Sequence, residues 1–523
     1  MGRYLNLTTK GFEESIQSEI YVDKTGIISL LNRMIDTEQK YVCVSRPRRF
    51  GKSMTVKMLS AYYNVEADSD KLFCTMEIGA DSTYKKYLNK YEVVLINMQE
   101  FYSRNSDIDL MLRKINGEVC RELKKRYPNV EYTDGESLVE TMYDIFLSAN
   151  KTFMILIDEW DCIFRESGCG EEGWRKYLNF LRDWMKDKPY ISLAYMTGIL
   201  PIKKYGSHSA LNMFTEYSMT NPKRMGCYMG FTGDEVERLC TQYQVSFEDV
   251  RAWYDGYSFE GASAIYSPKS VVECLTSRIF DNYWNQTETF EALKMYIQMN
   301  YDGLKDSVIE MIAGNRVKIN TGSFTNDMKT FHTADDVLTL LVHLGYLAYD
   351  FERKEVYIPN KEVRNEFLNA VNVIGWSEVT MAVKNSEKLL GRLWEKDENA
   401  VAAGIEKAHQ DNVSILQYND ENSLSCIVSL AFYAAQEYYM IFREMPAGKG
   451  YADLVWLPRK NHPDKPAVII ELKWDKSAAG AIAQIKNKNY PAALEGYAGT
   501  VLLVGINYDK DTKTHTCIIE ESI

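Results

Sequence analysis

The sequence predicts an α/β protein in three successive parts: a parallel-sheet domain, a largely helical middle region and a smaller α/β domain. Strand-length apolar runs alternate with longer amphipathic stretches in the first part. Helical spacing dominates the second part, and a series of strand-like runs occupies the third. The expected boundaries are 1–285, 286–380 and 381–523. Hydrophobic residues make up 46% and charged residues 26% of the 523 positions, the balance of ordinary globular proteins.

The charge and cysteine content exclude several classes of protein. The chain has 61 basic and 73 acidic residues, a net charge of −12. An acidic chain binds nucleic acid or anionic membranes poorly, so a polyanion site must be a local basic patch. The 10 cysteines are scattered without a CxxC pair, which disfavours zinc and a disulfide framework. With no targeting signal or membrane-length apolar run, we expect a cytoplasmic protein without membrane contact.

Four apolar runs in the first part are expected to form buried strands, at 41–45, 92–98, 153–158 and 191–198. Their apolar residues are continuous rather than alternating. This pattern is typical of a parallel sheet covered by helices on both faces.

A candidate phosphate-binding loop follows the first of these strands. Residues 46–53 (RPRRFGKS) end in the Gly-Lys-Ser of the pattern G-x-x-x-x-G-K-[ST], although Arg46 stands at the first glycine position. A helical pattern follows, so the backbone amides would lie at a helix N-terminus, where anions are favoured. Lys52 could reach the β- and γ-phosphates, and the Ser53 hydroxyl could ligate Mg²⁺. The expected nucleotide contacts in this loop are Arg49, Phe50, Gly51, Lys52 and Ser53.

Polar residues at the ends of two later strands could complete this site. Asp158 ends the run 153–158 and could hold the magnesium ion, while Glu159 could orient or deprotonate the attacking water. Thr197, near the end of the run 191–198, could contact the γ-phosphate. The alternative is that these residues only cap their strands.

Several motifs together resemble one family. They are YVDKT at 21–25, RPRRFGKS at 46–53, LIDEWD at 156–161, MTGIL at 196–200 and WYDGYSF at 253–259. The sequence is similar to the bacterial AAA-ATPase-like family, whose members often carry a C-terminal PD-(D/E)XK nuclease domain. The resemblance implies an AAA-type P-loop NTPase fold for the first part, with ATP and Mg²⁺ as ligands. Arg165, Arg182 and Arg224 follow the acidic strand and are candidates for an arginine finger.

The middle region contains a predicted helix and a predicted hairpin. Val337, Leu340, Leu341 and Leu344 have helical spacing, and residues 346–360 read as two strands with the turn at ERKE. A helix followed by a hairpin is compatible with a winged-helix-like domain. A small packing domain or lid is the other interpretation, and no basic recognition helix stands out.

The third part places acidic residues and a lysine on neighbouring predicted strands. Runs at 440–445, 451–458, 467–474, 500–508 and 515–521 read as strands, with a helix at 478–494. Glu471 and Lys473 are two residues apart and therefore share one face of a strand. If the second and third runs pair as a hairpin, Asp453 joins that face. Two carboxylates can bind Mg²⁺ and a lysine can stabilise developing charge, as phosphodiester hydrolysis requires.

This spacing resembles the PD-(D/E)XK pattern and implies a restriction-endonuclease-like fold. The expected catalytic residues are Asp453, Glu471 and Lys473, with the two acids as metal ligands. Glu444 or, in competition, Glu437 would supply the additional acidic position. The expected nucleic-acid contacts on the following helix are Gln484, Lys488 and Tyr490.

Together these features predict an ATP-binding and hydrolysing enzyme with a Mg²⁺-dependent nuclease domain that acts on nucleic acid, with DNA as the expected substrate. The alternative is an ATP-dependent regulatory or interaction protein whose C-terminal domain binds without catalysis. Assembly into a homo-oligomer is compatible with either function.

Overall fold

A computed structural model describes most of the chain. The described residues are 2–105, 107–165, 169–202, 210–259, 262–284, 289–299, 301, 303–325, 331–412, 421–447, 450–459, 461–494 and 499–522. The chain forms two compact units: unit 1 comprises Met1–Thr287 and Lys318–Val363, and unit 2 comprises Glu288–Val317 and Arg364–Ile523. The unit boundary falls within β9 (Val317–Lys318) and α17 (Lys361–Ile374). The three domain boundaries expected from the sequence stay predictions.

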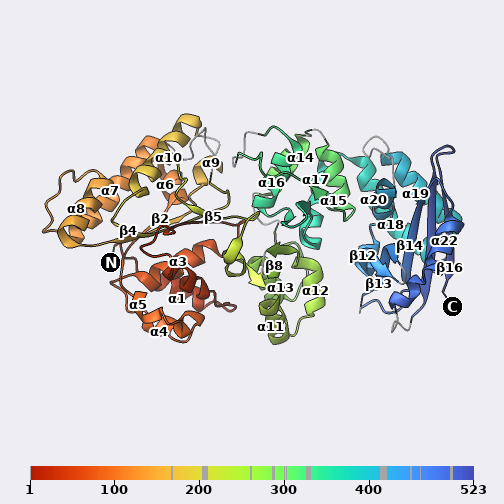
Figure 1. Ribbon diagram of the computed structural model, residues 1–523, viewed down its shortest axis with the longest axis horizontal. Helices are drawn as coiled ribbons and strands as arrows, with labels where there is room; N and C mark the ends of the chain where they lie inside the picture. Colours follow the sequence, from red (N-terminus) through yellow and green to blue (C-terminus); the bar gives the residue numbers. More distant parts are fainter. Residues whose placement is uncertain are drawn as a thin grey trace. The chain divides into compact units, whose positions relative to one another are not determined.

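A five-stranded parallel sheet forms the centre of unit 1 (Figure 1). In spatial order its strands are β2 (Glu92–Asn97), β3 (Phe153–Asp158), β4 (Ile191–Gly198), β1 (Tyr41–Ser45) and β5 (Thr215–Tyr217). The four strands expected from the apolar runs are confirmed to within one residue. Every residue of β1, β3 and β4 is buried, as expected for strands with helices on both faces.

Helices cover both faces of this sheet. In Figure 1, α1 (Lys10–Ile16) and α3 (Lys52–Tyr63) lie on one face, and α7 (Ile108–Arg126), α8 (Leu138–Ala149) and α10 (Glu171–Met185) lie on the other. The shorter helices of this region are α2 (Gly26–Asn32), α4 (Asp70–Phe73), η1 (Glu77–Ala80), α5 (Tyr84–Tyr87), α6 (Met98–Asn105) and α9 (Cys162–Arg165). Helix α3 packs directly on β2, β3 and β4. This packing places its N-terminus beside the ends of the strands.

The remainder of unit 1 is a smaller helical region. It contains η2 (Lys223–Tyr228), α11 (Gly233–Tyr243), α12 (Phe247–Tyr254), α13 (Pro268–Ser277) and the strands β6 (Phe231–Thr232), β7 (Tyr257–Phe259) and β8 (Ala262–Tyr266). Helix α16 (Ala334–Leu344) begins at a capping box of Thr333 and Asp336 and ends at Gly345, whose φ is 87°. The hairpin of β10 (Ala348–Asp350) and β11 (Glu355–Tyr357) follows. The predicted helix and hairpin are confirmed.

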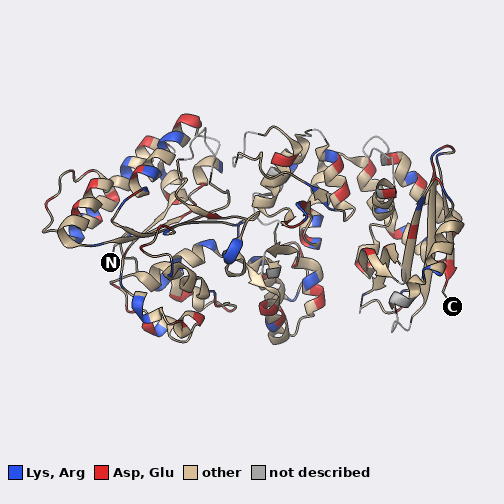
Figure 2. Ribbon diagram, in the orientation of Figure 1, with Lys and Arg blue, Asp and Glu red and all other residues tan. Residues whose placement is uncertain are grey.

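Unit 2 combines helices with a mixed five-stranded sheet. The helices are α14 (Thr289–Gln298), α15 (Leu304–Ile312), α18 (Ser377–Trp394), α19 (Glu398–Asn412), α20 (Glu421–Ala431), α21 (Ala435–Tyr438) and α22 (Ala478–Asn487). The strands, in spatial order, are β12 (Tyr439–Ala447), β13 (Gly450–Pro458), β14 (Ala467–Trp474), β15 (Val501–Asp509) and β16 (Thr514–Glu521). All five predicted strands are confirmed. Figure 2 shows acidic and basic residues interspersed over the helices of both units.

Strands β14 and β15 are parallel, and α22 makes the crossover between them. A Cβ atom at Gly505 of β15 would lie 2.4 Å from the carbonyl oxygen of Ala478, so this glycine permits the close packing of α22. The single helix predicted over 478–494 is wrong in its second half. Asn489 adopts a φ of 53°, and a short 3-10 helix, η3 (Tyr490–Leu494), follows. Pro491 explains the break, because proline disfavours α-helix at the preceding residue.

Candidate functional sites

The first candidate site lies at the N-terminus of α3, where β1 leads into the helix through residues 46–51. Gly51 is the last residue before α3 and has a φ of 87°. Apart from Gly51 and its chain neighbours, no atom of the described residues lies within 4 Å of a Cβ built there, so the space beside this turn is open. The first amides of α3 have no partner within the helix and, together with the helix dipole, favour an anion here.

Lys52 is buried at this turn and bonds to the backbone. Its Nζ atom donates a 2.9 Å hydrogen bond to the carbonyl oxygen of Pro47. Burial lowers the pKa of Lys52, while the carboxylates of Glu159, Asp161 and Asp158 raise it again. The ammonium group therefore lies close to three acids but is hydrogen-bonded to a neutral carbonyl group.

The structure brings Asp158 to this lysine and to Ser53, as the sequence predicts. Asp158 ends β3, and the nearby side chain of Ser53 acts to lower the pKa of its carboxyl group. The Nδ2 atom of Asn97, on the neighbouring strand β2, lies 3.5 Å from Asp158 Oδ2. Burial raises the pKa of Asp158, and the nearby charge of Glu159 raises it further. This hydroxyl and buried carboxylate are hard oxygen donors of the kind that Mg²⁺ prefers.

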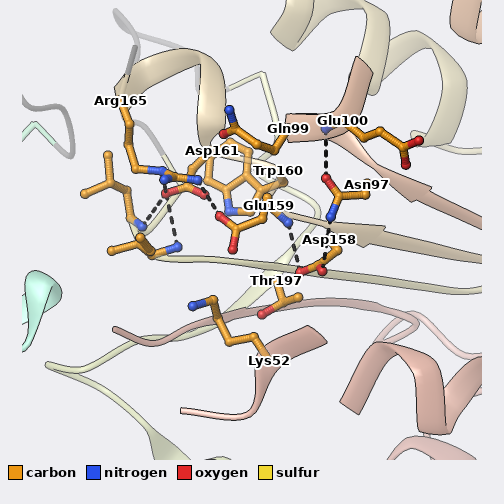
Figure 3. A network of polar contacts seen from close by, with 12 residues as sticks. Lys52, Asn97, Gln99, Glu100, Asp158, Glu159, Trp160, Asp161, Arg165 and Thr197 are labelled. Atoms are coloured by element: carbon orange, nitrogen blue, oxygen red, sulfur yellow. Dashed lines mark hydrogen bonds and ion pairs between the residues drawn. The ribbon is translucent and has the colours of Figure 1, made fainter. Parts of the chain in front are cut away.

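Glu159 belongs to a charged network that the sequence analysis did not predict (Figure 3). The guanidinium of Arg165 bonds to Glu159 Oε2, and its Nε atom lies 3.2 Å from Asp161 Oδ2. The carboxylate of Asp161 also accepts hydrogen bonds of 3.1 and 2.8 Å from the amides of Ile199 and Leu200. Arg165 was a candidate arginine finger, but in this structure it is committed to acids of its own chain.

Three other predicted residues lie at the same site with their side chains bonded or packed elsewhere. The Thr197 hydroxyl donates a 2.9 Å hydrogen bond to the carbonyl oxygen of Val44 on the neighbouring strand. Arg49 donates to the carbonyl oxygen of Tyr283 at 3.0 Å. Phe50 is buried, with its ring centroid 5.5 Å from that of Tyr257. Their roles as nucleotide contacts stay predictions, and for Arg49 and Phe50 the backbone amides are the available donors.

Arg46, noted in the sequence only as a departure from the glycine pattern, is fully buried. Its guanidinium donates hydrogen bonds to the carbonyl oxygens of Ser45 and Tyr217, at 2.8 and 2.9 Å, and lies over the ring of Phe259. Burial lowers the pKa of Arg46 to about 10. Arg46 therefore connects the loop that precedes α3 to the end of β5. No local sequence signal indicates this role, because the carbonyl partner in β5 is distant in the chain.

The second candidate site lies on β13 and β14, which form the predicted antiparallel pair. Leu454 pairs with Ile470, so Asp453 and Glu471 lie at neighbouring register positions. Asp453 Oδ2 accepts a 2.7 Å hydrogen bond from the amide of Leu472. Burial raises the pKa of Asp453, against the effects of this hydrogen bond and of Lys473. The predicted pairing of Asp453 with the Glu471 strand is confirmed.

Glu471 is buried and only one of its two oxygens is bonded. Oε1 accepts a 2.8 Å hydrogen bond from Lys473 Nζ and a further one from Gln484 Nε2. Oε2 is buried, and it has no hydrogen-bond partner within the part of the chain that the structure describes. Burial raises the pKa of Glu471, and the Lys473 ammonium opposes this shift. An unbonded buried carboxylate oxygen beside a second acid fits a hard divalent cation.

Gln484 and Tyr490 brace this site from within the fold. The Nε2 atom of Gln484 also lies 3.3 Å from the Tyr490 hydroxyl, which donates a 2.6 Å hydrogen bond to the carbonyl oxygen of Tyr451. The ring of Tyr490 is buried, and the ammonium of Lys488 lies 5.8 Å from its centroid. Contacts of these three residues with nucleic acid stay predictions. For Gln484 and Tyr490, the structure shows an additional role in positioning Glu471.

Two further carboxylates act on Asp453. Glu421, at the start of α20, and Glu444, on β12, both raise the pKa of Asp453. Glu437, the competing candidate for the additional acid, lies on α21. Sequence reasoning missed Glu421 because nothing local connects the start of a helix to a strand so far along the chain. Within the described ranges, no three His, Cys, Asp or Glu side chains are already grouped as ligands for a metal ion.

Two family models match this chain, and each match contains one of the two candidate sites. Residues 7–207 match the family model described as "Predicted AAA-ATPase", and residues 419–517 match the model of the PD-(D/E)XK nuclease superfamily. The chain therefore carries an AAA-ATPase-like domain and, C-terminal to it, a domain of the PD-(D/E)XK nuclease superfamily. Within the described residues, no helix has the length and apolar character needed to cross a membrane.

Individual relatives are distant. An "uncharacterized protein in vnfD 5'region" of Azotobacter chroococcum mcd 1 is 23% identical over 280 residues, and the match spans 51% of each chain. The chain thus matches about half the length of this relative. A Walker-type ATPase of Pyrococcus abyssi is 11% identical, with a TM-score of 0.32 over 69% of this chain and 94% of its own. The Aeropyrum pernix ORC2 protein is 9% identical, with a TM-score of 0.32 over 70% of this chain and 98% of its own.

Proposed function

We propose that unit 1 binds and hydrolyses ATP at the turn that precedes α3. The observation that carries this proposal is the meeting of Lys52, Ser53 and Asp158 at one edge of a parallel sheet. Ligands of open α/β sheets bind at the carboxyl ends of the strands; Asp158 ends β3, and Lys52 and Ser53 begin the helix that follows β1. The open space beside Gly51 leaves room for phosphate groups against the amides of α3.

In this proposal each residue has a separate task. Lys52 exchanges its bond to the Pro47 carbonyl for the β- and γ-phosphate oxygens, which are stronger acceptors because they are charged. Ser53 and Asp158 would hold Mg²⁺, which neutralises phosphate charge when it is bound. Glu159 orients the attacking water and accepts its proton. Thr197, at the end of the adjacent strand, contacts the γ-phosphate or this water.

We further propose that the C-terminal domain cleaves nucleic acid, with DNA as its substrate. The half-bonded carboxylate of Glu471, next to Asp453 and Lys473, supports this proposal. The two acids would hold a divalent ion, which when bound lowers the pKa of water to generate a nucleophile. Lys473 stabilises negative charge on the phosphate. Lys488 contacts the phosphate backbone of the nucleic acid, and such a contact does not depend on the base sequence.

ATP hydrolysis tests the first proposal. Purified full-length protein should release phosphate from ATP in the presence of Mg²⁺. Lys52→Ala should reduce kcat by about 100-fold or more, because the charge lost acts directly on the transferred phosphate. Lys57→Ala, on the same helix but exposed, is the matched control and should keep wild-type activity. Hydrolysis that persists unchanged in Lys52→Ala would contradict the proposed site.

Cleavage of DNA tests the second proposal and separates it from a purely regulatory function. Plasmid and single-stranded DNA should be cut with Mg²⁺ or Mn²⁺, and Asp453→Ala and Glu471→Ala should each abolish cutting while ATP hydrolysis continues. Asp464→Ala removes an exposed carboxylate from the loop between β13 and β14 and serves as the control. If the wild-type protein hydrolyses ATP and binds DNA without cutting it, the domain is a binding module and the regulatory alternative is correct.

A further inference from the structure

Within the described residues, the carboxylate of Glu159 is hydrogen-bonded through one oxygen, Oε2. Arg165 bonds to Oε2, and the side chains of Arg165 and Glu159 are only 10% and 22% exposed. Figure 3 shows the carboxylate between the guanidinium of Arg165 and the ammonium of Lys52, and Glu159 is also the acid that acts most strongly on the pKa of Lys52. Oε2 of Glu159 thus bonds to Arg165 of α9, while the carboxylate remains close to Lys52 at the turn before α3.

Arg165 is itself fixed by a second acid. Its Nε atom is 3.2 Å from Oδ2 of Asp161, whose side chain is fully buried. The same oxygen accepts the amides of Ile199 and Leu200, the first residues after β4. A continuous set of contacts therefore leads from the end of β4 through Asp161 and Arg165 to Glu159.

The backbone at Glu159 makes this support necessary. Glu159 has a φ of 53°, in the left-handed region that side-chain-bearing residues seldom adopt, so its position depends on the surrounding contacts. Three carboxylates, at 158, 159 and 161, also act together on Lys52 here, and the charge of Glu159 acts against that of Asp158. The guanidinium of Arg165 bonds to Glu159 and also places its Nε atom 3.2 Å from Asp161, a spread of charge over two acids that an ammonium group cannot reproduce.

We infer that Arg165 is a positioning residue of the ATPase site, which holds Glu159 in the orientation needed to align the attacking water. The inference rests on the proposed ATP hydrolysis by unit 1. It assigns Arg165 a role within its own chain, through Glu159, in place of the arginine-finger role that the sequence suggested. A general base must lie within hydrogen-bond reach of its proton, and a displacement of about 1 Å can cost about 100-fold in rate.

The first test compares Arg165→Met with Arg165→Lys. Arg165→Met should lower kcat by about 10- to 100-fold, with less than about a threefold change in the KM for ATP, because substrate binding depends on the phosphate turn. Arg165→Lys keeps the charge and should recover part of kcat, and it also tests the inference if Arg165→Met fails to fold. Arg175→Met is the matched control, since Arg175 lies exposed on α10 and has no role in the proposed site.

A double-mutant cycle then separates positioning from direct contact with the phosphate. In a Glu159→Gln background, which removes the base, replacing Arg165 by Met should change kcat by less than about twofold, because residues that act as a unit are not additive. A full additional loss in that background would mean that Arg165 contacts the phosphate itself and would overturn the inference. An increase of kcat in Arg165→Met alone would show that the contact between Arg165 and Glu159 inhibits hydrolysis, and it would also overturn the inference.

Two further readouts keep the outcomes distinct. The affinity for a non-hydrolysable ATP analogue and the thermal unfolding midpoint of Arg165→Lys should remain close to the wild-type values. If the wild-type protein hydrolyses no ATP, the proposed function fails. If it hydrolyses ATP and Arg165→Lys and Arg165→Met both keep wild-type kcat, only the positioning role fails.

Discussion

The two candidate sites use the same residue types in opposite ways. In unit 1, Lys52 lies close to acids but bonds to the carbonyl oxygen of Pro47 at 2.9 Å. In unit 2, Lys473 bonds directly to Glu471 at 2.8 Å. In unit 1 the partner of the site's acids is instead Arg165, which contacts both Glu159 and Asp161.

This difference indicates which ligand each site can accept. A lysine bonded only to a neutral carbonyl group can transfer its hydrogen bond to an incoming anion without leaving an acid unpaired. Lys473, by contrast, is already paired with buried Glu471, whose Oε2 atom has no hydrogen-bond partner among the described residues. The comparison therefore supports the proposals that the first site binds a phosphate group and the second a metal ion.

The largest expected effect is on the free energy of unfolding, and it differs between substitutions of Lys473 and Lys52. Lys473→Met leaves Glu471 buried without its cation, and breaking such a pair should cost about 3 kcal/mol. Lys52→Met removes a buried cation that has no direct acid partner among the described residues, so the free energy of unfolding should change by less than about 1 kcal/mol. Denaturant unfolding, with hydrogen exchange of the β14 amides as the readout specific to unit 2, measures both. Equal losses for the two variants would contradict the comparison.

A second prediction concerns buried histidines in unit 2. The rings of His409 and His515 lie 5.1 Å apart beside Tyr508, and Glu406 acts on His409. Burial lowers the pKa of His409 to about 4 and that of His515 to about 3, from an ordinary value of 6.5. Below pH 6.5 the unfolded chain therefore binds more protons than the folded chain, and stability falls as pH falls. The loss between pH 7 and pH 5 should be roughly 2 kcal/mol for each histidine.

Urea unfolding of unit 2 as a function of pH measures this slope. Replacing both histidines with Gln should flatten the dependence over that interval, whatever its effect on absolute stability. His343 in unit 1, whose pKa is lowered to about 3 by burial, is single and should give a slope about half as steep there. A pH-independent midpoint for unit 2 would refute the prediction.

The smallest expected effect compares one glycine from each unit. Gly51→Ala places a side chain at a φ of 87° and should cost about 1 kcal/mol through backbone strain, since no neighbouring atom obstructs the Cβ. Gly391→Ala, in the interior of α18 where the space is also open, should instead stabilise the protein by about 0.5–1 kcal/mol. Thermal unfolding of both variants should give shifts of opposite sign; shifts of the same sign would be inconsistent with the left-handed geometry at Gly51.

Local features of the sequence determined most of the secondary structure. Continuous apolar runs predicted β1 and β3, because strands buried on both faces need no polar alternation. The period of two residues along a strand placed Glu471 and Lys473 on one face, and they are hydrogen-bonded in the structure. The Gly-Lys-Ser turn and Asp158 were paired correctly, because parallel strands bring their carboxyl ends to one edge of the sheet.

The tertiary structure alone decided how the charged groups are partnered. The contact of Arg165 with Glu159 and Asp161 and the hydrogen bond from Gln484 to Glu471 depend on packing and loop geometry. Each of these contacts is set within a few ångströms by side chains on different elements, whereas sequence periodicity specifies only which face of an element a residue occupies. A pattern in the sequence can therefore name the acids and the lysines of a site, but the fold determines which of them remain available to a ligand.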